Sequence, residues 1–477
     1  MDILIGKGGE VQVIQVFKDE KQVDKGQEIY DYILERELFK GELGQTYADI
    51  SPKGENIIFV GLGEREKLSA EYIRRAFYSV AKKLNSLKVK SAGVSVKSYE
   101  GVSDEEAILG LAEGLLQSEY SFEKYMSEKK HKLVLEEFYL DAAENKSINI
   151  EEIISEAKNI VEGVFLARDL VNEPAITITP VELARRAKEE LEAVGVEVEV
   201  FGRDKIEELG MEAFLSVSKG SANEPQFIVM HWNGDKSSDE KLALVGKGLT
   251  YDSGGYSIKP TSGMLTMKSD MAGSASVIGA MKTIALSATK KNVVGIVAAC
   301  ENLISGEAYK PGDVVGSMSG KTIEVLNTDA EGRITLADSL YYAATVIKAD
   351  YIVDIATLTG GCVVAFGDVN TGAVTNNQDL MDTVLSASKV AGEPMWQLPT
   401  NEEYKKALKG DIADLKNTTG AGASALSAGL FLGEFVNDTP WVHLDIAGTS
   451  YMDKARNYLP KGASGVPVKT LYNLAKI

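Results

Sequence analysis

The most constraining feature of the sequence is a charged loop set between a strand pattern and a helix pattern. Residues 322–326 are rich in β-branched and apolar side chains, and residues 334–344 repeat apolar side chains at helical spacing. The loop between them reads NTDAEGR and places Asp329, Glu331 and Arg333 at alternate positions. Charges at the carboxyl end of a strand are costly to bury unless something neutralises them. The loop therefore favours a sheet that carries a divalent cation, since carboxylate oxygens suit Mg²⁺, Mn²⁺ and Zn²⁺.

The same loop can also be interpreted as an ordinary helix cap. Thr328 and Glu331 have the spacing of a capping box, and Asp329 would lie in a first turn, where the helix dipole stabilises anions. This pattern is common, so the loop taken by itself favours the cap. Charged residues upstream shift the balance toward a metal site.

A glycine-rich stretch upstream carries the matching charges. Residues 241–245 are an apolar strand pattern that we expect to end there, and Lys247 follows between two glycines. Asp252 comes five positions later in a turn of Gly and Ser, and Lys259 precedes a proline. Asp270 opens the next expected helix, which reaches about residue 285. The residue order of a phosphate-binding P-loop is not met here.

The charged residues of both stretches are expected to meet, because ligands of open α/β sheets bind outside the carboxyl ends of the strands. They are the carboxylates Asp252, Asp270, Asp329 and Glu331 and the cations Lys247, Lys259 and Arg333. Such a set fits a two-metal site with a cationic clamp. A lysine ligates metal only as the neutral amine, and two nearby metal ions would lower its pKa enough. The alternative is a glycine-rich loop with incidental charges.

Length, charge and histidine content narrow the function further. A chain of 477 residues is too long for one ordinary core, so two or three domains are expected. The net charge of −19 disfavours nucleic acid and anionic membranes as partners. There is no apolar run of about 18 residues and no secretory leader, so we expect no membrane span and a cytoplasmic location. With three histidines and no H-E-x-x-H pair, hydrolytic chemistry would rest on carboxylates, lysines and metal.

The alternation of strand and helix patterns predicts an α/β protein of two domains. Residues 1–150 would form a smaller α/β domain with a mostly parallel sheet and a role in structure or assembly. An apolar stripe at helical spacing predicts a linker helix over 151–170, after a break in charge near 144–146. Residues 171–477 would form a larger catalytic α/β domain with a central mixed sheet flanked by helices. Further expected elements are strands at 11–16, 56–60, 88–96, 132–139, 196–200 and 226–230 and helices at 69–87, 104–116 and 180–194.

Several motifs of the C-terminal region resemble one known family. The loop NTDAEGR is similar to the signature of the leucyl (cytosol) aminopeptidases, the M17 metallopeptidases. Other stretches agree with that family in order and spacing. They are DLVNEP from 169, VGKG from 245, DSGG from 252, IKP from 258, MKSDM from 267, ATLTG from 356 and WVHLDIAGT from 441. The resemblance covers about residues 165–460, and departures such as Tyr251 and residues 303–306 remove no expected ligand.

The resemblance implies a metal-dependent exopeptidase. It would release N-terminal amino acids, with Leu and other apolar residues favoured, through a hydroxide activated by two divalent ions, Mn²⁺ or Zn²⁺. The tighter ion would be held by Lys247, Asp252, Asp270 and Glu331, and the exchangeable ion by Asp252, Asp329 and Glu331. Peptides would be the partners of a homohexameric enzyme.

The resemblance also implies roles for residues that do not bind metal. Lys259 would polarise the scissile carbonyl, and Arg333 would hold a bicarbonate ion as the general base, helped by backbone amides near Leu358 and Gly360. Residues implied to contact the substrate are Lys259, Met267, Asp270, Asn327, Thr357, Leu358 and Thr359. Met267 and the 357–361 loop could instead be ordinary core.

Two other functions stay open. One is a two-metal phosphoesterase, although such sites usually add histidines to the carboxylates. The other is a catalytically divergent or non-enzymatic relative, although an inactive relative would be expected to lose a ligand.

Overall fold

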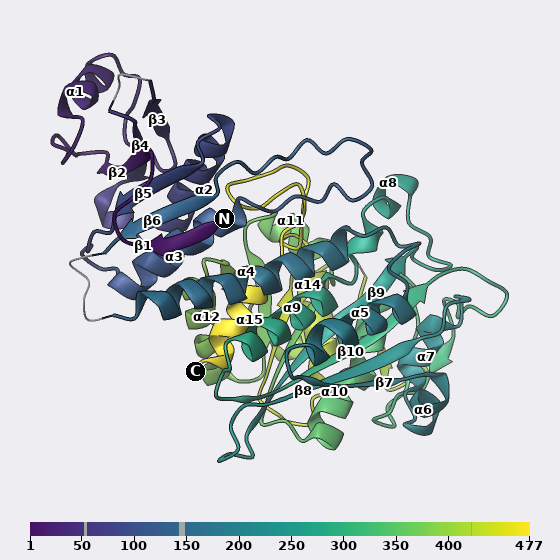
Figure 1. Ribbon diagram of the computed structural model, residues 1–477. Helices are drawn as coiled ribbons and strands as arrows, with labels where there is room; N and C mark the ends of the chain where they lie inside the picture. The colour runs from purple at the N-terminus through teal and green to yellow at the C-terminus, as the bar shows by residue number, and fades with distance from the viewer. Residues whose placement is uncertain (52–54, 143–147, 421) are drawn as a thin grey trace. The chain divides into compact units, whose positions relative to one another are not determined.

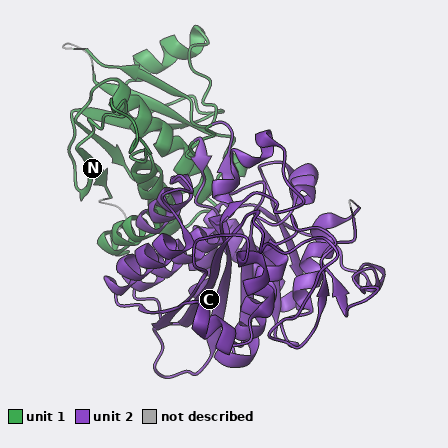
Figure 2. Ribbon diagram, turned by 90° about the vertical axis from the view of Figure 1, so that its right-hand side faces the viewer, with its two compact units in different colours: residues 1–161, 455–460 green, residues 162–454, 461–477 purple. Residues whose placement is uncertain are grey.

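The computed structural model describes residues 1–51, 55–142, 148–420 and 422–477, so the charge break predicted near 144–146 lies outside the described residues. The chain forms two compact units (Figure 2). Unit 1 contains residues 1–161 and 455–460, and unit 2 contains residues 162–454 and 461–477. A helix, α4 (Ile150–Asn172), spans the range expected for the linker helix. Among the described residues, no helix is both long enough and apolar enough to cross a bilayer.

Unit 1 is built on a six-stranded sheet with the order β1-β6-β5-β2-β4-β3. All neighbouring pairs are parallel except β3 with β4, so the mostly parallel sheet is confirmed. Its elements are β1 (Asp2–Ile5), β2 (Val11–Phe17), α1 (Gln27–Glu35), β3 (Thr46–Asp49), β4 (Ile57–Gly63), η1 (Arg65–Lys67), α2 (Ala70–Ser86), β5 (Ser91–Ser95), α3 (Asp104–Gln117) and β6 (Glu137–Asp141).

Two strands of unit 1 begin later than predicted. The strand expected from residue 88 starts at Ser91, because Lys88 takes a left-handed conformation with φ +59° just after α2. The strand expected from residue 132 starts at Glu137. The amides of Val134 and Leu135 donate to Oδ1 of Asn85, so a side chain accepts the hydrogen bonds that a neighbouring strand would otherwise accept.

Unit 2 is built on an eight-stranded mixed sheet with the order β15-β14-β17-β13-β9-β10-β8-β7, as predicted. The four central strands β17, β13, β9 and β10 are parallel, and β8 and β14 add antiparallel pairs on either side. The strands are β7 (Glu197–Phe201), β8 (Gln226–Asn233), β9 (Lys241–Asp252), β10 (Asn292–Asn302), β13 (Tyr351–Ala356), β14 (Thr371–Thr375), β15 (Met395–Gln397) and β17 (Trp441–Asp445).

Helices cover both faces of this sheet (Figure 1). One face packs against α5 (Pro180–Glu192), α9 (Ala272–Leu286), α12 (Gln378–Ala391) and α15 (Val468–Ala475), and the other against α7 (Glu212–Ser218), α10 (Gly332–Tyr342) and α14 (Ser424–Gly433). The shorter elements are α6 (Arg203–Glu208), α8 (Thr261–Met264), η2 (Met267–Ser269), β11 (Val314–Val315), β12 (Ile323–Glu324), η3 (Ala343–Ile347), α11 (Gly360–Phe366), α13 (Glu402–Lys406), β16 (Leu415–Lys416), β18 (Tyr451–Met452) and β19 (Gly462–Ala463).

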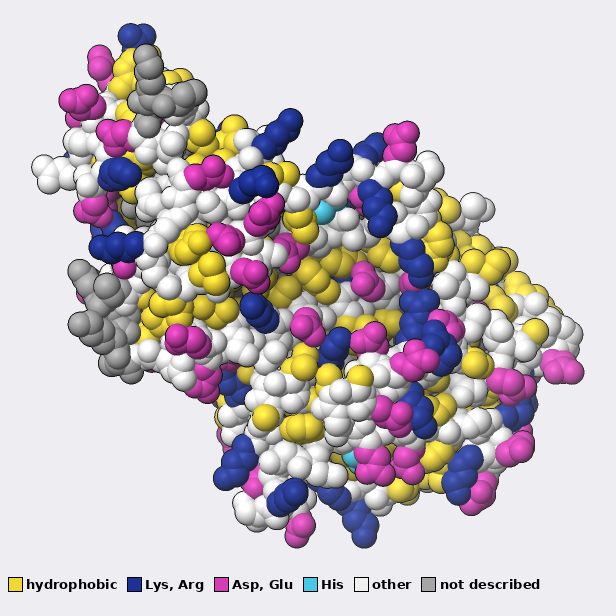
Figure 3. All heavy atoms as spheres, viewed as in Figure 1, with side chains coloured by type: hydrophobic (Ala, Val, Ile, Leu, Met, Phe, Trp, Pro, Cys, Tyr) yellow, Lys and Arg dark blue, Asp and Glu magenta, His cyan; other side chains and the backbone are white. Residues whose placement is uncertain are grey.

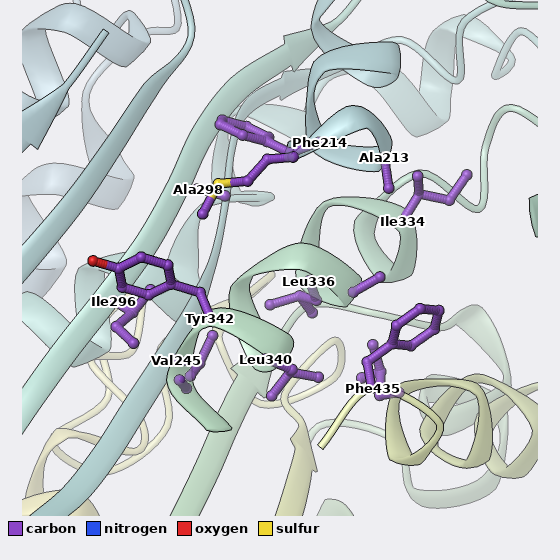
Figure 4. Close-up of a cluster of buried hydrophobic side chains, with 14 of the residues drawn as sticks. Ala213, Phe214, Val245, Ile296, Ala298, Ile334, Leu336, Leu340, Tyr342 and Phe435 are labelled. Atoms are coloured by element: carbon purple, nitrogen blue, oxygen red, sulfur yellow. The ribbon is translucent and has the colours of Figure 1, made fainter. Parts of the chain in front are cut away.

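The core beneath α10 fixes the helix that follows the charged loop (Figure 4). Leu336 and Leu340 of α10 pack with Val245 and Ile296 of the sheet and with Phe435, and all five are buried. Burying each such side chain contributes about 1.5–3 kcal/mol. The loop that precedes α10 is therefore anchored to a rigid layer.

Two predicted boundaries around the charged loops were wrong. The strand expected to end at residue 245 continues to Asp252, so Lys247 lies within β9. Gly246 makes this possible, because a Cβ there would lie 2.6 Å from Cα of Ser274 in α9. The strand expected over 322–326 is only β12, since the Leu326 amide donates to Oδ1 of Asn417.

Candidate metal centre

A cavity of about 1110 Å³ opens in unit 2 where β9, β13 and the 327–333 loop end. Every residue predicted for the site lines it. They are Lys247, Asp252, Lys259, Met267, Asp270, Asn327, Asp329, Glu331, Arg333, Thr357, Leu358, Thr359 and Gly360. The structure therefore brings together residues from four separate stretches of the chain, and the convergence of their polar groups on one cavity is a feature of ligand sites.

The inner part of the cavity holds a buried lysine between two carboxylates. Nζ of Lys247 lies 2.8 Å from Oδ2 of Asp270 and 2.9 Å from Oε1 of Glu331. It also donates to the carbonyl of Thr357, whose hydroxyl donates to Oδ1 of Asp270 at 2.8 Å. The side chain of Lys247 passes under Gly332, where a Cβ would lie 2.4 Å from its Cε. A larger residue at position 332 would therefore displace the end of this lysine.

The outer part holds a second lysine between two further carboxylates. Nζ of Lys259 lies 2.8 Å from Oδ2 of Asp252 and also contacts Oδ1 of Asp329. The loop between Asp252 and Lys259 turns through Gly254 with φ +86°, and a Cβ there would lie 2.8 Å from Oδ1 of Asp329. Lys259 is partly exposed to the cavity, whereas Lys247 is buried. Lys259 is thus the cation that a bound molecule can reach.

Three carboxylates are close enough to share a cation. Asp252, Asp329 and Glu331 each offer one oxygen, and these oxygens lie within 4.8 Å of one another. Oε2 of Glu331 is buried and has no hydrogen-bond partner in the described part of the chain. Leaving a buried acceptor unsatisfied costs about 1–3 kcal/mol. The oxygen-rich donor set and this unmatched oxygen fit divalent cations.

Burial and mutual repulsion shift the pKa values of these groups. Burial raises the pKa of Asp270 to about 8, against the opposing effect of Lys247. Burial and then Glu331 raise the pKa of Asp252 to about 6. Burial would also raise the pKa of Glu331, but Lys247 and Lys259 outweigh it and lower the pKa. Burial would lower the pKa of Lys247, but Asp270 and Glu331 raise it. Cation binding at Lys247 must therefore release its proton.

Arg333 lies at the start of α10 with its guanidinium buried. Its Nε and Nη1 atoms have no hydrogen-bond partner among the described residues. Burial lowers the pKa of Arg333 to about 10, although Glu331 and Asp445 oppose the shift, so the side chain stays cationic at neutral pH. A planar guanidinium with two free donors fits an anion with two acceptor oxygens.

The loop after β13 lines the same cavity as Arg333. Thr359 caps α11 by accepting a hydrogen bond from the Cys362 amide. The Leu358 amide donates to Oδ1 of Asp445 at 3.2 Å, and the Thr359 hydroxyl donates to Oδ2 of the same carboxylate at 2.6 Å. Asp445 therefore orders the loop, and the Leu358 amide already has an acceptor.

The capping-box interpretation of Thr328 and Glu331 was wrong. The Thr328 hydroxyl donates to the Gly254 carbonyl at 2.7 Å and accepts from the Ser257 amide at 2.8 Å. Helix α10 begins at Gly332, and no side chain caps it. Asp270 was also expected to open a helix, but it follows η2 and precedes α9 by two residues. Tertiary contacts, not local capping, set the conformation of these residues.

Three asparagine and aspartate side chains that support the site were not predicted. Asn302 donates to Asp252, Asn417 donates to the Asn327 carbonyl at 2.6 Å, and Asp445 holds the 357–360 loop. A signal existed for Asn302, because residues 292–302 are a mainly apolar run that ends in a polar pair, as a strand does where it reaches a site. Its contact depends on the register of β10 against β9, which no local pattern reveals.

Comparison with protein families places both parts of the chain. The model of the cytosol aminopeptidase family, catalytic domain, matches residues 165–472. The model of the N-terminal domain of the same family matches residues 13–129. The two matches together cover most of the chain.

Individual relatives are similar over nearly the whole length. A probable cytosol aminopeptidase of Clostridium tetani is 59% identical over 100% of this chain and 99% of its own length. One from Treponema denticola is 44% identical over 99% of this chain and 98% of its own. Among solved structures, the bottromycin maturation enzyme BotP in complex with Mn has a TM-score of 0.88 at 31% identity, covering 98% of this chain and 99% of that one.

Proposed function

Because the chain belongs to the cytosol aminopeptidase family, a family of hydrolases, we propose that it is a cytoplasmic aminopeptidase that uses two divalent metal ions. It would release N-terminal residues from peptides, with Leu and other apolar residues preferred. The observation that carries the proposal is the convergence of Asp252, Asp329 and Glu331 within 4.8 Å, beside two lysines. The similar enzyme BotP was solved with Mn, which supports Mn²⁺ or Zn²⁺ as the ions.

Five residues would hold the ions. Lys247, Asp252, Asp270 and Glu331 would bind one, and Asp252, Asp329 and Glu331 the other. Such a pair of ions supplies an acidified water as the nucleophile and polarises the scissile carbonyl. The buried carboxylates contribute a negative cluster that binds cations strongly because water is largely excluded from it.

Lys259 and Arg333 would act directly on the reacting groups. Lys259 reaches the cavity with a protonated amine, since burial lowers its pKa less than Asp252, Glu331 and Asp329 raise it. Its charge would stabilise the oxyanion as the carbonyl is attacked. The unmatched Nε and Nη1 of Arg333 would hold a bicarbonate ion as the general base, with support from the Gly360 end of the neighbouring loop.

The cavity walls would select the N-terminal side chain of the peptide. Met267 contributes an apolar wall, and Thr357, Leu358 and Thr359 contribute another. Asn327 and Asp270 line the same cavity and would offer polar groups for the peptide main chain. An apolar wall beside charged groups fits a short aliphatic residue with a free α-amine.

Assembly and partners follow from the same family. We propose a homohexamer with peptides as its substrates. The net charge of −19 disfavours nucleic acid as a partner. On the face drawn in Figure 3, acidic and basic side chains are interspersed, and a mixed surface of this kind is not built to follow a phosphate backbone.

The proposal is tested with purified protein, Mn²⁺ or Zn²⁺, and Leu-p-nitroanilide. We expect metal-dependent release of p-nitroaniline, and a fall in kcat/KM of about 10²–10³-fold in Lys259→Ala, as for the loss of one oxyanion donor. Lys310→Ala is the matched control, since the exposed Lys310 forms an ion pair with the partly exposed Asp313. Hydrolysis of p-nitrophenyl phosphate without release of p-nitroaniline would instead identify a phosphoesterase, and inactivity toward both would identify a non-enzymatic relative.

A further inference from the structure

Asn302 lies beside the proposed metal ligand Asp252 in the sheet. It ends β10, which runs parallel to β9, and the register pairs Asn302 with Asp252. Asn302 is completely buried, and Asp252 is 2% exposed. An amide in such a place needs a polar partner, because a buried polar group without one is costly.

The amide of Asn302 has two acceptors on the same nitrogen. Nδ2 donates to Oδ1 of Asp252 at 2.8 Å and to the carbonyl of Thr328 at 2.9 Å. Both partners are acceptors, which fixes the orientation of the amide with Nδ2 toward them. Oδ1 of Asn302 points elsewhere, near Gly255, where a Cβ would lie 2.9 Å from it.

The two carboxylate oxygens of Asp252 have different partners. Oδ1 accepts from Nδ2 of Asn302 and from the Gly254 amide, each at 2.8 Å. Oδ2 pairs with Nζ of Lys259, and both residues line the cavity. With Oδ1 already accepting two hydrogen bonds, Oδ2 is the oxygen left to face a cation.

The second bond of Asn302 reaches the other ligand-bearing segment. Thr328 precedes Asp329 in the charged loop, and its carbonyl also accepts from the Tyr309 hydroxyl at 2.9 Å. One amide group therefore ties the end of β9 to the 327–331 loop, which are far apart in sequence. The separation between Asp252 and the carboxylates of that loop depends on this tie.

We propose that Asn302 is a positioning residue for the metal centre, which makes Asp252 a one-oxygen ligand and fixes its separation from Asp329 and Glu331. The inference rests on the proposed function, because it assumes that these carboxylates bind cations. Groups that orient a metal ligand change metal affinity by about 10–100-fold when they are removed. A residue that only filled the core would change stability instead.

The test compares Mn²⁺ binding by the full-length protein and by Asn302→Ala, using calorimetric titration. We expect the Kd for Mn²⁺ to rise by about 10–100-fold. Tyr309→Phe is the matched control, because it removes a hydrogen bond to the same Thr328 carbonyl but leaves Asp252 untouched. Its Kd should change by well under the 10-fold that is about the smallest effect expected of Asn302→Ala, because the bond it removes reaches no carboxylate of the site.

Each outcome decides between the possible roles. A wild-type Kd in Asn302→Ala, with only the thermal stability lowered, would overturn the inference and leave a packing role. Equal losses in Asn302→Ala and Tyr309→Phe would also overturn it, because the Thr328 loop alone would then be responsible. If Asn302→Ala does not fold, Asn302→Ser replaces it, since a serine hydroxyl cannot reach both acceptors. Failure of the wild-type protein to bind Mn²⁺ would reject the proposed function itself.

Discussion

Each unit contains a buried cluster of charged side chains. The two clusters differ in whether their polar atoms have hydrogen-bond or ion-pair partners, and we call an atom with such a partner matched. In unit 1, Nε and Nη2 of Arg74 donate to the two oxygens of Glu113 at 2.9 Å, and Nη1 donates to Glu71. Glu71 also accepts from Arg75 and from the Tyr458 hydroxyl. In this cluster, every nitrogen of the buried arginine has a carboxylate partner.

The cluster of unit 2 is unbalanced by contrast. The predicted site residues that line the cavity include four carboxylates and three cations, and Oε2 of Glu331 and two nitrogens of Arg333 have no hydrogen-bond partner within the described ranges. Buried polar atoms are almost always matched in proteins, so each exception needs an explanation. A matched cluster stabilises a fold, whereas unmatched atoms at a cavity indicate a site that a ligand completes. The difference between the two clusters therefore indicates the functional site in unit 2 without the use of any sequence motif.

The largest expected effect is the loss of activity in Glu331→Gln. The amide keeps the size of the side chain but removes the charge that both ions would share, so kcat/KM should fall by at least about 10³-fold. The melting temperature of the metal-free protein should fall only modestly, because the amide oxygen can still accept from Lys247, which also keeps Asp270 as a partner. Both quantities are measured on the same preparation. The control is Glu307→Gln, at an exposed position.

The Glu331→Gln variant can also contradict the distinction drawn between the two clusters. Should Glu331→Gln unfold the metal-free protein while the small active fraction turns over normally, the carboxylate would be structural like Glu113. The unmatched oxygen would then carry no functional meaning.

The opposite effect is expected in unit 1, where Glu113→Ala should cost stability and spare the chemistry. Removing one partner of a buried ion pair costs about 3–5 kcal/mol, because the remaining charge of Arg74 is left without its main acceptor. Urea unfolding measures this loss, and kcat per folded molecule should be unchanged. The double variant Arg74→Met with Glu113→Leu is the control, since an apolar pair of similar volume should recover most of the loss. A fall in kcat equal to that of Glu331→Gln would contradict the comparison.

The positions of these site residues could be predicted from the sequence, because their residue types and their spacing indicate the site directly. Lys247 between glycines, Asp252 in a glycine turn and the alternating charges of 329–333 all line one cavity. The α/β class of both units followed from the alternation of strand and helix patterns.

The cap, the strand boundary and the support of the site depend on contacts between segments that are distant in sequence. Local sequence patterns therefore gave wrong predictions for them or none. Thr328 looked like a helix cap, but its hydroxyl binds Gly254 in another loop. Strand β9 was predicted too short, because glycines usually end strands, and here Gly246 provides room for α9 instead. The role of Asn302 follows from its register opposite Asp252, which only the assembled sheet determines.

The smallest expected effect concerns a third kind of cluster, which is matched but exposed. On α5, hydrogen bonds from Arg185 and then Arg186 lower the pKa of Glu182 from 4.5 to about 2. A lowered folded pKa means that the ionised form stabilises the fold. This contribution is complete above the unfolded value of 4.5 and disappears as the pH falls through about 2. Since both arginines are accessible to water, screening limits the contribution to about 0.5–1 kcal/mol.

Glu182→Gln should therefore lower the free energy of unfolding by about 0.5–1 kcal/mol at pH 7 and by almost nothing near pH 2. Urea unfolding of the wild type and the variant at both pH values measures the difference. Glu189→Gln is the control on the same helix, because Glu189 pairs with Arg185 alone and is 63% exposed, so its effect should be smaller at pH 7. A loss as large as that of Glu113→Ala would mean that matching, and not burial, sets the strength of these clusters. The small loss of unfolding free energy expected for Glu182→Gln would instead show that burial sets the strength of these clusters. A polar atom without a partner would then indicate a functional site only where it is buried.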